Sequence, residues 1–480
     1  MEQIPMLIAG RRVPARSGEW IPVQNPATEE EIAQVPRGMP EDVAAAAEVA
    51  AAAFPAWSRT PPAERARLLR ACADRVAARA DALALQLTEE QGKPLAEARK
   101  EIDEVIRTFI YYAGAAVTVP GEIAPTDAAT TKSLVFKYPV GVVAAIGPWN
   151  YPVSLLAWKI APALAAGCAL VVKPATETPL AALAMVEEVQ AAGVPPGVVN
   201  LVTGYGRDIG DALVDHPLVR KISFTGSTEV GRRIMARAAN GPKRVSLELG
   251  GHCPLIVWHD ADFDRAVRDG VHRSFRNMGQ ICNSVNRIYV HRRIAEAYVE
   301  AFVRATRTLR VGDGRTPGVD LGPMATRAGM VKTLEHIADG VARGAALLCG
   351  GRRPPSVGGS RGYFLEPAVL ADVDHTMKVM QEETFGPLAP IMVVDDLDQA
   401  IALANDTEYG LVAYAYTRDL RTAMEFVDRL EAGSIGVNSV SVASVYAPYG
   451  GWKASGLGRE LGLHGLEGYL ELKHAVVDVS

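Results

Sequence analysis

From Gly141 onward the sequence repeats one unit four times, in which a short apolar run is followed by a glycine-containing turn and a helical segment. The apolar runs cover residues 142–146, 169–172, 198–202 and 221–224, and the helical segments reach to 165 and cover 179–192, 208–215 and 228–239. Short, continuously apolar strands alternating with helices are what a parallel sheet covered on both faces requires. The repeat therefore predicts a doubly wound α/β domain that binds a nucleotide.

Other segments extend this organisation. A second alternating pattern runs from residue 250 to about 444, with apolar runs at 254–258, 287–291 and 389–394, and predicts another α/β unit. Residues 1–36 predict short strands with a hairpin at Gly10, and helical spacing predicts three helices over 41–57, 62–91 and 95–119. A chain of 480 residues is long enough for more than one domain.

The charge balance and the cysteines exclude several classes of protein. A net charge of -5 and an isoelectric point near 6.1 argue against a general binder of nucleic acid or membrane surfaces. The five cysteines are few, odd in number and widely spaced, which suits a reducing compartment and forms no CxxC pair for a metal. The first residues lack a signal-peptide pattern, and the apolar run 43–54 is short and interrupted by Glu48. We therefore expect a cytoplasmic protein without a metal centre.

One cysteine, Cys282, lies in the polar stretch Asn-Met-Gly-Gln-Ile-Cys-Asn-Ser-Val-Asn-Arg, at 277–287, which predicts a connection between a helix and a strand. A nucleophilic thiolate needs a lowered pKa and a nearby base or donor. Glu248 and Asn150 are candidates, because each lies in a glycine-containing turn next to an apolar run. The residues alone leave open a packing cysteine, an ion-paired glutamate and a turn asparagine.

Six motifs in this order resemble the aldehyde dehydrogenase superfamily. They are Gly-Pro-Trp-Asn-Tyr-Pro at 147–152, Phe-Thr-Gly-Ser-Thr-Glu-Val-Gly at 224–231, Leu-Glu-Leu-Gly-Gly at 247–251, Gly-Gln-Ile-Cys at 279–282, Glu-Glu-Thr-Phe-Gly-Pro at 382–387 and Pro-Tyr-Gly-Gly-Trp-Lys-Ala-Ser-Gly at 448–456. The resemblance covers nearly the whole chain. It implies a Rossmann-like cofactor domain over 1–118 and 141–249, an α/β catalytic domain over 250–444, and a small β arm over 119–140 and 465–480. In the family this arm joins subunits, so we expect a homodimer or homotetramer.

The resemblance also implies the chemistry. Cys282 would attack a small-molecule aldehyde to form a thiohemiacetal, Asn150 would donate to the oxyanion, and Glu248 would activate the water that opens the resulting thioester. The separation of 34 residues between Glu248 and Cys282 is that of hydrolytic members. Two alternatives remain: a cysteine-dependent hydrolase using His252 or His272, and a coenzyme A-acylating aldehyde dehydrogenase, which generally lacks the glutamate.

The prediction of the cofactor depends on less specific signals. The run from Gly204 to Gly210 misses the G-x-G-x-x-G spacing by one residue. Lys173 follows a buried strand, so its ammonium must reach water or a ligand, and the family places it on the adenosine ribose. Where relatives that prefer NAD carry a glutamate, this chain has Thr176, so we expect NAD or NADP to be accepted unless Glu177 turns inward. The expected cofactor residues are Ile146, Pro148, Trp149, Lys173, Thr176, Gly206, Gly210, Phe224, Thr225, Gly226, Ser227, Leu249, Glu383 and Phe385.

The substrate stays open. Arg276, six residues before Cys282, corresponds to an arginine of semialdehyde-oxidising relatives, although a surface salt bridge is the alternative. Their usual second arginine is replaced by Trp158. Succinate semialdehyde is therefore one candidate, a hydroxyaldehyde such as lactaldehyde is another, and an apolar or aromatic aldehyde bound by Tyr151 and Trp158 is a third.

Overall fold

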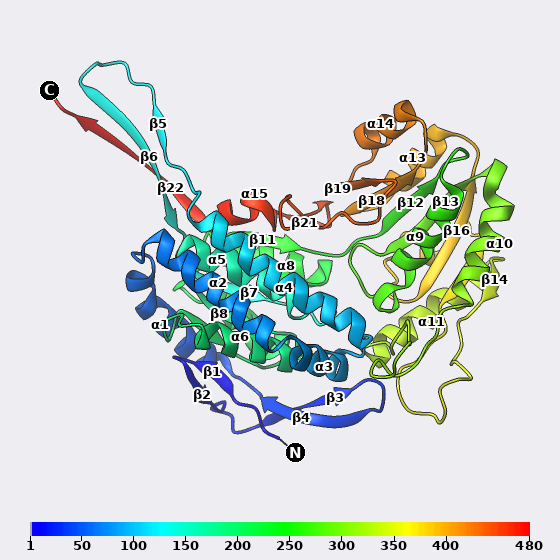
Figure 1. Ribbon diagram of the computed structural model, residues 1–480, viewed down its shortest axis with the longest axis horizontal. Helices are drawn as coiled ribbons and strands as arrows, with labels where there is room; N and C mark the ends of the chain where they lie inside the picture. Colours follow the sequence, from blue (N-terminus) through cyan, green and yellow to red (C-terminus); the bar gives the residue numbers. More distant parts are fainter. Residues whose placement is uncertain (1) are drawn as a thin grey trace.

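The computed structural model describes residues 2–480, and two sheets of mainly parallel strands form its two lobes (Figure 1). The first sheet has the order β2-β1-β9-β8-β7-β10-β11-β21. Its strands are β1 (Met6–Ile8), β2 (Arg11–Val13), β7 (Val142–Ile146), β8 (Ala169–Lys173), β9 (Val199–Leu201), β10 (Val219–Thr225), β11 (Arg244–Glu248) and β21 (Gly456–Leu457). The five strands from β9 to β11 are parallel, and the predicted doubly wound sheet is confirmed.

Helices cover both faces of this sheet because alternate strand residues point to opposite sides. Val143 and Ala145 pack into one core, whereas Val142 and Ala144 pack into the other. The first core is completed by α2 (Pro62–Ala78), α3 (Ala80–Gln91), α4 (Leu95–Ala116), α5 (Ser154–Ala166) and α6 (Leu180–Ala191). The second is completed by α1 (Pro40–Trp57), α7 (Gly206–Asp215) and α8 (Thr228–Ala238). This sheet and these helices are the first lobe.

The helix predicted over 62–91 is wrong in one respect, because it is two helices. Arg79 leaves the helical conformation, with φ of -114° and ψ of 12°, and separates α2 from α3. Its guanidinium, like that of Arg75, pairs with Glu188 on α6. No glycine or proline lies at the break, so no local signal in the sequence marks it. The next helix, α4, ends at Ala116 rather than at the predicted residue 119.

The second lobe is built around a sheet of order β14-β15-β16-β13-β12-β18-β19, in which only β14 is antiparallel. The strands are β12 (Cys253–Val257), β13 (Val285–His291), β14 (Ala346–Cys349), β15 (Ala368–Ala371), β16 (Leu388–Val394), β18 (Val412–Tyr416) and β19 (Ser434–Val437). Its helices are α9 (Phe263–Phe275), η1 (Arg276–Gly279), η2 (Arg292–Ile294), α10 (Ala295–Thr306), α11 (Arg327–Ala342), α12 (Lys378–Gln381), α13 (Leu397–Asn405) and α14 (Leu420–Arg429). After β19 the chain returns to the first lobe, where β21 pairs with β11.

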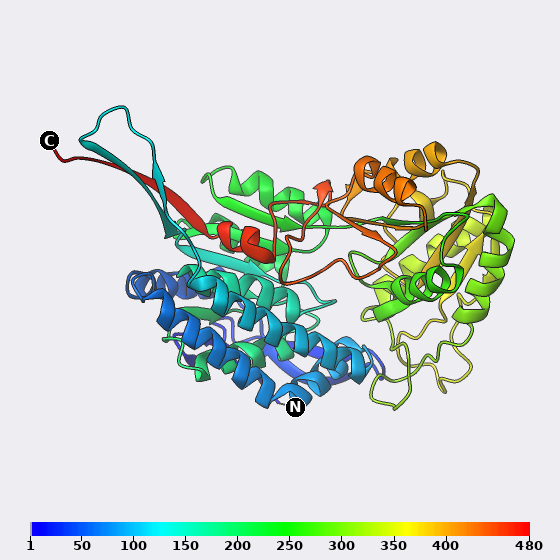
Figure 2. The same cartoon turned by 45° about the horizontal axis from the view of Figure 1, so that its top comes forward.

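A three-stranded antiparallel sheet projects from the first lobe in both views (Figures 1 and 2). It consists of β5 (Glu122–Ala124), β6 (Thr131–Pro139) and β22 (Leu470–Asp478), and α15 (Gly462–Glu467) precedes its last strand. Ile123, Leu472 and Val476 are exposed on it. Two small pairs complete the fold: β3 (Trp20–Asn25) with β4 (Glu30–Pro36), and β17 (Tyr409–Gly410) with β20 (Trp452–Lys453). No helix within residues 2–480 is long and apolar enough to cross a membrane.

Candidate active site

Residues of three motifs, those at 147–152, 279–282 and 448–456, meet at one cavity of about 320 Å³, which Glu248 does not line. Asn150 follows β7 at its carboxyl end, and Cys282 lies between η1 and β13. Both line this cavity, as do the other predicted substrate residues, Tyr151, Trp158 and Arg276. Ligands of doubly wound folds bind at the carboxyl ends of the strands, and this cavity has that position relative to β7.

The loop that carries Cys282 has an unusual backbone. Asn277, Met278 and Gly279 have φ values of 49°, 59° and 68°, in the left-handed region. A Cβ on Gly279 would lie 2.2 Å from the carbonyl oxygen of Gly386, so only glycine fits there. Non-glycine residues persist in this conformation only where the surroundings hold them, and such strain gathers at functional sites.

Among residues 2–480, the side chain within hydrogen-bond distance of the Cys282 thiol is Tyr449. The Cys282 Sγ lies 3.7 Å from the hydroxyl of Tyr449, close enough for a weak hydrogen bond. Burial raises the pKa of Cys282 to about 12, and the contact with Tyr449 is the largest effect that lowers it. The thiol is therefore protonated at neutral pH and needs a base to become nucleophilic.

Asn150 is fixed on both sides. Its side-chain Nδ2 donates to the carbonyl of Gln280 at 2.9 Å, and its own carbonyl accepts from Lys93 at 2.8 Å. A side-chain amide has two N–H donors, so one remains for a group inside the cavity. The asparagine is thus oriented toward the cysteine loop before any substrate arrives.

Glu248 ends β11 and is buried, and neither of its carboxyl oxygens has a hydrogen-bond partner in the described chain. Burial raises its pKa well above the ordinary value, and the charge of Glu460 raises it further, whereas Lys159 lowers it. Glu460 itself is held by Lys159 at 2.5 Å. A Cβ on Gly450 would lie 2.8 Å from a Glu248 oxygen, so glycine keeps space for this carboxyl. The ion-pair alternative for Glu248 is not what the geometry shows.

Comparisons with known proteins agree with this arrangement. The sequence profile described as "Aldehyde dehydrogenase family" matches residues 13–475. The chain is 44% identical to the succinate-semialdehyde dehydrogenase (NADP+) of Escherichia coli K12, over 98% of this chain and 97% of that protein. It is 45% identical to the 3-sulfolactaldehyde dehydrogenase of Pseudomonas putida, over 97% and 95%. A betaine aldehyde dehydrogenase of Staphylococcus aureus in complex with NAD+ has a TM-score of 0.96 at 36% identity, covering 99% of this chain and 95% of that one.

The chain belongs to the aldehyde dehydrogenase family. It is an oxidoreductase that oxidises an aldehyde to a carboxylic acid with NAD or NADP. The predicted family, fold class and activity are confirmed.

An aldehyde dehydrogenase must hold a dinucleotide, and the residues beside the first sheet fit one. Lys173, at the end of β8, is buried, and its ammonium donates only to the adjacent Pro174 carbonyl, at 3.1 Å. Burial lowers its pKa to about 8, and the charge of Glu177 offsets this only in part. It therefore does not reach water, and a ligand hydroxyl would complete its bonding. Nearby, Thr176 donates to the Gly204 carbonyl at 3.3 Å, and Glu177 is exposed.

The start of α8 supplies an anion-binding position. Ser227 is the N-cap of this helix and accepts from the Val230 backbone N–H at 3.4 Å. Unpaired N–H groups and the helix dipole favour a phosphate there. Gly226 turns closely over Phe224, whose ring would lie 2.4 Å from an added Cβ. The preceding Thr225 accepts from Lys159 at 2.7 Å.

The remaining cofactor candidates differ in how well their surroundings support them. Glu383 is a half-buried acid whose pKa desolvation raises to about 7, and it accepts from the Gly251 N–H at 2.9 Å. Phe385, with φ of 54°, packs edge-on against Trp149. Ile146 and Leu249 belong to the core beside the first sheet, and Pro148 is half-buried between β7 and α5. An added Cβ at Gly206 or Gly210 would meet open space, so packing does not require either glycine.

Arg276 is less free than the sequence suggested. Its Nε donates to Glu97 at 2.8 Å, and the same carboxylate accepts from the Tyr151 hydroxyl at 2.6 Å. The partner Glu97, on α4, keeps a lowered pKa despite its burial because Arg276 and Lys93 stabilise its charge. Arg276 is therefore in a half-buried salt bridge on the cavity wall.

Two residues that line the cavity, Arg273 and Tyr449, were missed, as was Glu97, which bonds to the lining residues Arg276 and Tyr151. Arg273 precedes Arg276 by three residues, a spacing that would place both on one face of a continuous helix, although α9 ends at Phe275. Tyr449 lies inside the motif at 448–456 and could have been singled out as an aromatic hydroxyl. Glu97 had no signal, because its partner lies 179 positions away.

The Cys-His alternative has no geometric support. His252 is buried with no hydrogen-bond partner on either ring nitrogen, and burial lowers its pKa well below the ordinary value. His272 is exposed on α9. Neither pairs with Cys282, whose side-chain hydrogen-bond contact is Tyr449. Across the described part of the chain, no group of three or more His, Cys, Asp or Glu residues is placed to hold a metal ion.

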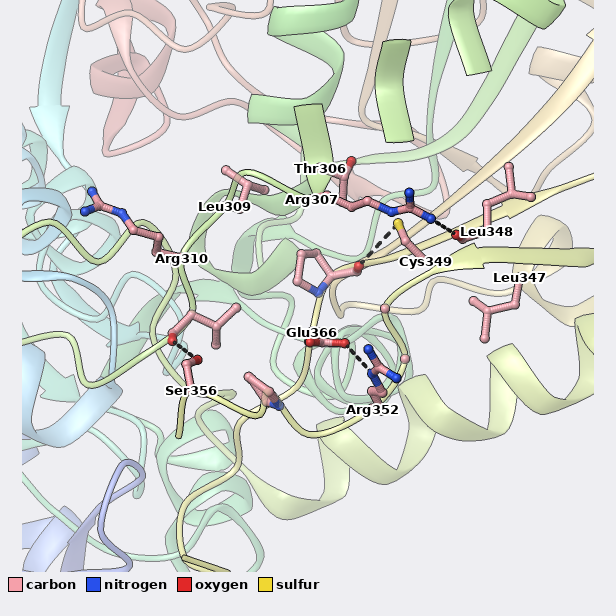
Figure 3. Close-up of a pocket in the computed structure, with 15 residues that line it drawn as sticks. Thr306, Arg307, Leu309, Arg310, Leu347, Leu348, Cys349, Arg352, Ser356 and Glu366 are labelled. Carbon is pink, nitrogen blue, oxygen red and sulfur yellow. Dashed lines mark hydrogen bonds and ion pairs between the residues drawn. The ribbon is translucent and has the colours of Figure 1, made fainter. Parts of the chain in front are cut away.

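A larger cavity, of about 960 Å³, lies elsewhere in the second lobe (Figure 3). Its arginines are already bonded: Arg352 pairs with Glu366 at 2.9 Å, and Arg307 donates to the Leu348 carbonyl at 2.9 Å. Burial raises the pKa of its one thiol, Cys349. None of the six sequence motifs lines it, so size alone does not make it the site of the chemistry.

Proposed function

We propose that this aldehyde dehydrogenase oxidises a small aldehyde bearing a second, anionic group, and releases the free acid by hydrolysis. The observation that carries the proposal is the single cavity in which Cys282 and Asn150 lie together with the cationic side chains Arg273 and Arg276. The relatives named succinate-semialdehyde dehydrogenase and 3-sulfolactaldehyde dehydrogenase support it, because both names describe an aldehyde with an anionic group.

The first chemical step is attack by sulfur. Glu248 accepts the thiol proton of Cys282 through water, and the Sγ forms a bond to the aldehyde carbon. The carbonyl oxygen becomes an oxyanion, to which the free N–H of Asn150 and the backbone N–H of Cys282 donate. Each such donor typically contributes about 3 to 4 kcal/mol to transition-state stabilisation. The product of this step is a thiohemiacetal on Cys282.

The second half returns the enzyme to its starting state. When bound, the nicotinamide supplies the acceptor for the hydride that leaves the thiohemiacetal carbon. Cys282 then carries a thioester. Glu248, once it has released the thiol proton to water, takes a proton from the water that attacks the thioester. The carbon–sulfur bond breaks, the acid leaves, and Cys282 recovers its proton. The absence of hydrogen-bond partners on Glu248 suits this role, because a free carboxyl can turn toward water.

The two alternatives have less support. A coenzyme A-acylating enzyme would not need Glu248, for which the chain keeps a buried space next to Gly450. A cysteine hydrolase would need a histidine at Cys282, and both candidates lie elsewhere. Hydrolysis to the free acid is therefore the outcome we propose.

We also propose that NADP is accepted as well as NAD. Thr176 adds no negative charge beside Lys173, and the carboxylate of Glu177 is exposed. A 2'-phosphate would then meet no fixed anion at this position. The relative named succinate-semialdehyde dehydrogenase (NADP+) supports the acceptance of NADP.

Location and assembly are proposals of the same kind. The cysteines described are all free, in keeping with a cytoplasmic protein. The arm formed by β5, β6 and β22 carries exposed apolar side chains, which supports pairing into a homodimer or homotetramer. We keep the domain division 1–118 with 141–249, 250–444, and 119–140 with 465–480, and add β21 to the first domain because it pairs with β11.

The proposal is tested by following reduction of NAD and NADP with aliphatic, aromatic, hydroxy and carboxylated aldehydes, with and without coenzyme A. We expect reduction without coenzyme A, fastest with an anionic aldehyde. Cys282→Ala should abolish turnover and leave binding of the dinucleotide, measured by calorimetry, unchanged. Turnover in this variant would refute the nucleophile, and a requirement for coenzyme A would refute hydrolysis.

A further inference from the structure

We infer that Arg273 is the main anchor for the anionic group of the substrate, and not Arg276, the arginine that corresponds to one in semialdehyde-oxidising relatives. This inference rests on the proposed function, since it assumes an anionic aldehyde. Arg273 would then set the preference for an anionic aldehyde, because the other positive charges of the cavity are already paired or exposed to solvent.

Arg276 already has an anion. Glu97 lies 2.8 Å from its Nε and is itself held by Tyr151 and by the backbone N–H of Asn277 at 3.3 Å. A substrate carboxylate at Arg276 would approach a second carboxylate whose position is fixed by three donors. Like charges this close oppose each other strongly where little water screens them. Arg276 with Glu97 is therefore close to neutral as seen by a substrate.

The other cations around the cavity are paired or solvated. Lys93 pairs with Glu101 at 2.5 Å, and Arg107 pairs with Glu104 at 2.8 Å. Lys100 is exposed at the cavity rim. Arg273 is the buried cation of this cavity for which no carboxylate partner is found among residues 2–480.

The bonds that Arg273 does make are all to neutral groups. It is 7% exposed, its Nη1 donates to the Asn283 side chain at 3.1 Å, and its Nη2 donates to the Val440 carbonyl. Its Nε is buried with no partner. A guanidinium has five N–H donors, so this one is under-used. Its place in the last turn of α9 stabilises a positive charge only partly.

A buried cation without an anion destabilises the protein unless a ligand supplies the charge. Arg273 lines the same cavity as Cys282, so an aldehyde bound there can present its carbonyl to the thiol and its anion to the guanidinium. Trp158 lines that cavity too and packs edge-on against Tyr449, so this part of the wall is aromatic and adds no charge. The structure thus assigns the anion to the α9 side.

The test compares two aldehydes of equal chain length, 4-oxobutanoate and butanal, and uses the ratio of their kcat/KM values. For Arg273→Met we expect this ratio to fall about 100-fold, chiefly through KM for 4-oxobutanoate, because a hydrogen-bonded charge pair is lost. The ratio for Arg273→Lys should lie between those of the wild type and Arg273→Met, because lysine keeps the positive charge but not the forked guanidinium. Lys100→Met is the matched control, since it removes an exposed charge from the same cavity; we expect a change of less than about threefold.

Arg276 is tested by the double variant E97Q/R276M, which removes both members of the salt bridge and leaves no unpaired buried charge. We expect the ratio to fall less than about fivefold, because the pair is close to neutral. A second readout is competitive inhibition by succinate, which requires no turnover: its inhibition constant should rise in Arg273→Met and Arg273→Lys and change little in the double variant.

The outcomes separate the two proposals. If the wild type prefers 4-oxobutanoate, but the preference survives in both Arg273 variants and collapses in the double variant, the inference is overturned and the proposed function stands. If the wild type shows no preference for the anionic aldehyde and no inhibition by succinate, the substrate part of the proposed function fails as well. If Arg273→Met does not fold, Arg273→Lys and succinate inhibition decide the matter.

Discussion

Two glutamates of the active-site region, the half-buried Glu97 and the buried Glu248, have opposite surroundings. Glu97, at the start of α4, is held by Arg276, Tyr151 and the backbone N–H of Asn277. Glu248, at the end of β11, has no hydrogen-bond partner in the described chain. The pKa of Glu97 is lowered because cations outweigh its burial, and that of Glu248 is raised because burial and a second carboxyl act together.

The difference separates structural support from proton transfer. A carboxylate that is fully bonded and keeps its charge fixes the cavity wall but is a poor base. A carboxyl that is buried and unbonded contributes little to stability, and its raised pKa makes it a stronger base than an ordinary carboxylate. The same side chain thus serves two purposes at two positions around Cys282, and each can be tested by the same substitution, glutamate to glutamine.

The largest expected effect follows from Glu248→Gln. Steady-state turnover should fall about 1000-fold, since thioester hydrolysis loses its base, and at most a single burst of cofactor reduction should remain. Below pH 4.5, where this carboxyl is neutral in both the folded and the unfolded state, stability should hardly change, because the carboxyl has no bonds to lose. Stopped-flow absorbance measures the burst, and thermal unfolding measures the stability. Full steady-state activity would remove Glu248 from the mechanism.

Glu97→Gln should show the converse pattern. The free energy of unfolding should fall by about 3 kcal/mol, because Arg276 keeps a half-buried charge without its anion. The double variant E97Q/R276M should recover most of this loss. Urea unfolding of the three proteins provides the measurement, and activity should change far less than in Glu248→Gln. Equal stability of the wild type and Glu97→Gln would mean that the salt bridge is not supporting the wall.

The two glutamates should also differ in the sign of their pH dependence. The folded-state pKa of Glu97 lies below the ordinary 4.5. Its contribution to the free energy of unfolding is therefore present above pH 4.5 and is lost as the pH falls through the folded-state pKa. For Glu248 the folded-state pKa lies above 4.5, so its contribution is present below that pH and is lost as the pH rises through the folded value.

Stability measured from pH 3 to 9 against each glutamine variant checks these signs. On acidification, the free energy of unfolding of the wild type should fall relative to that of Glu97→Gln. On alkalinisation, it should fall relative to that of Glu248→Gln. The steepest slope expected for one group is about 1.4 kcal/mol per pH unit. Parallel curves for both variants would mean that the two carboxyls do not differ as described.

Sequence patterns predicted the features that depend on residues close together in the chain. The apolar runs at 142–146 and 169–172 became β7 and β8, and the motif residues Cys282 and Asn150 line one cavity. The break at Arg79 was missed because periodicity continues through it while the helix turns to reach Glu188. The neutralisation of Arg276 by Glu97 was also missed, because it joins positions 179 apart. Whether a charge is free depends on packing between distant segments, which a sequence alone does not display.

The smallest effect expected comes from Tyr449→Phe, which tests how the thiol itself is tuned. The tyrosine hydroxyl is the largest influence that lowers the pKa of Cys282, so removing it should raise that pKa further and leave less thiolate at neutral pH. We expect kcat/KM at pH 7 to fall about three- to tenfold, the size of one weak hydrogen bond, and to recover as the pH rises. The ring contact with Trp158, at 5.6 Å between centroids, is kept by phenylalanine, so stability should not change.

A pH profile of kcat/KM distinguishes the two groups around the thiol: the loss in Tyr449→Phe is recovered in alkali, whereas the steady-state loss in Glu248→Gln is not, because hydrolysis still lacks its base. An unchanged profile in Tyr449→Phe would leave Glu248 and Arg273 as the groups that control the charge of Cys282.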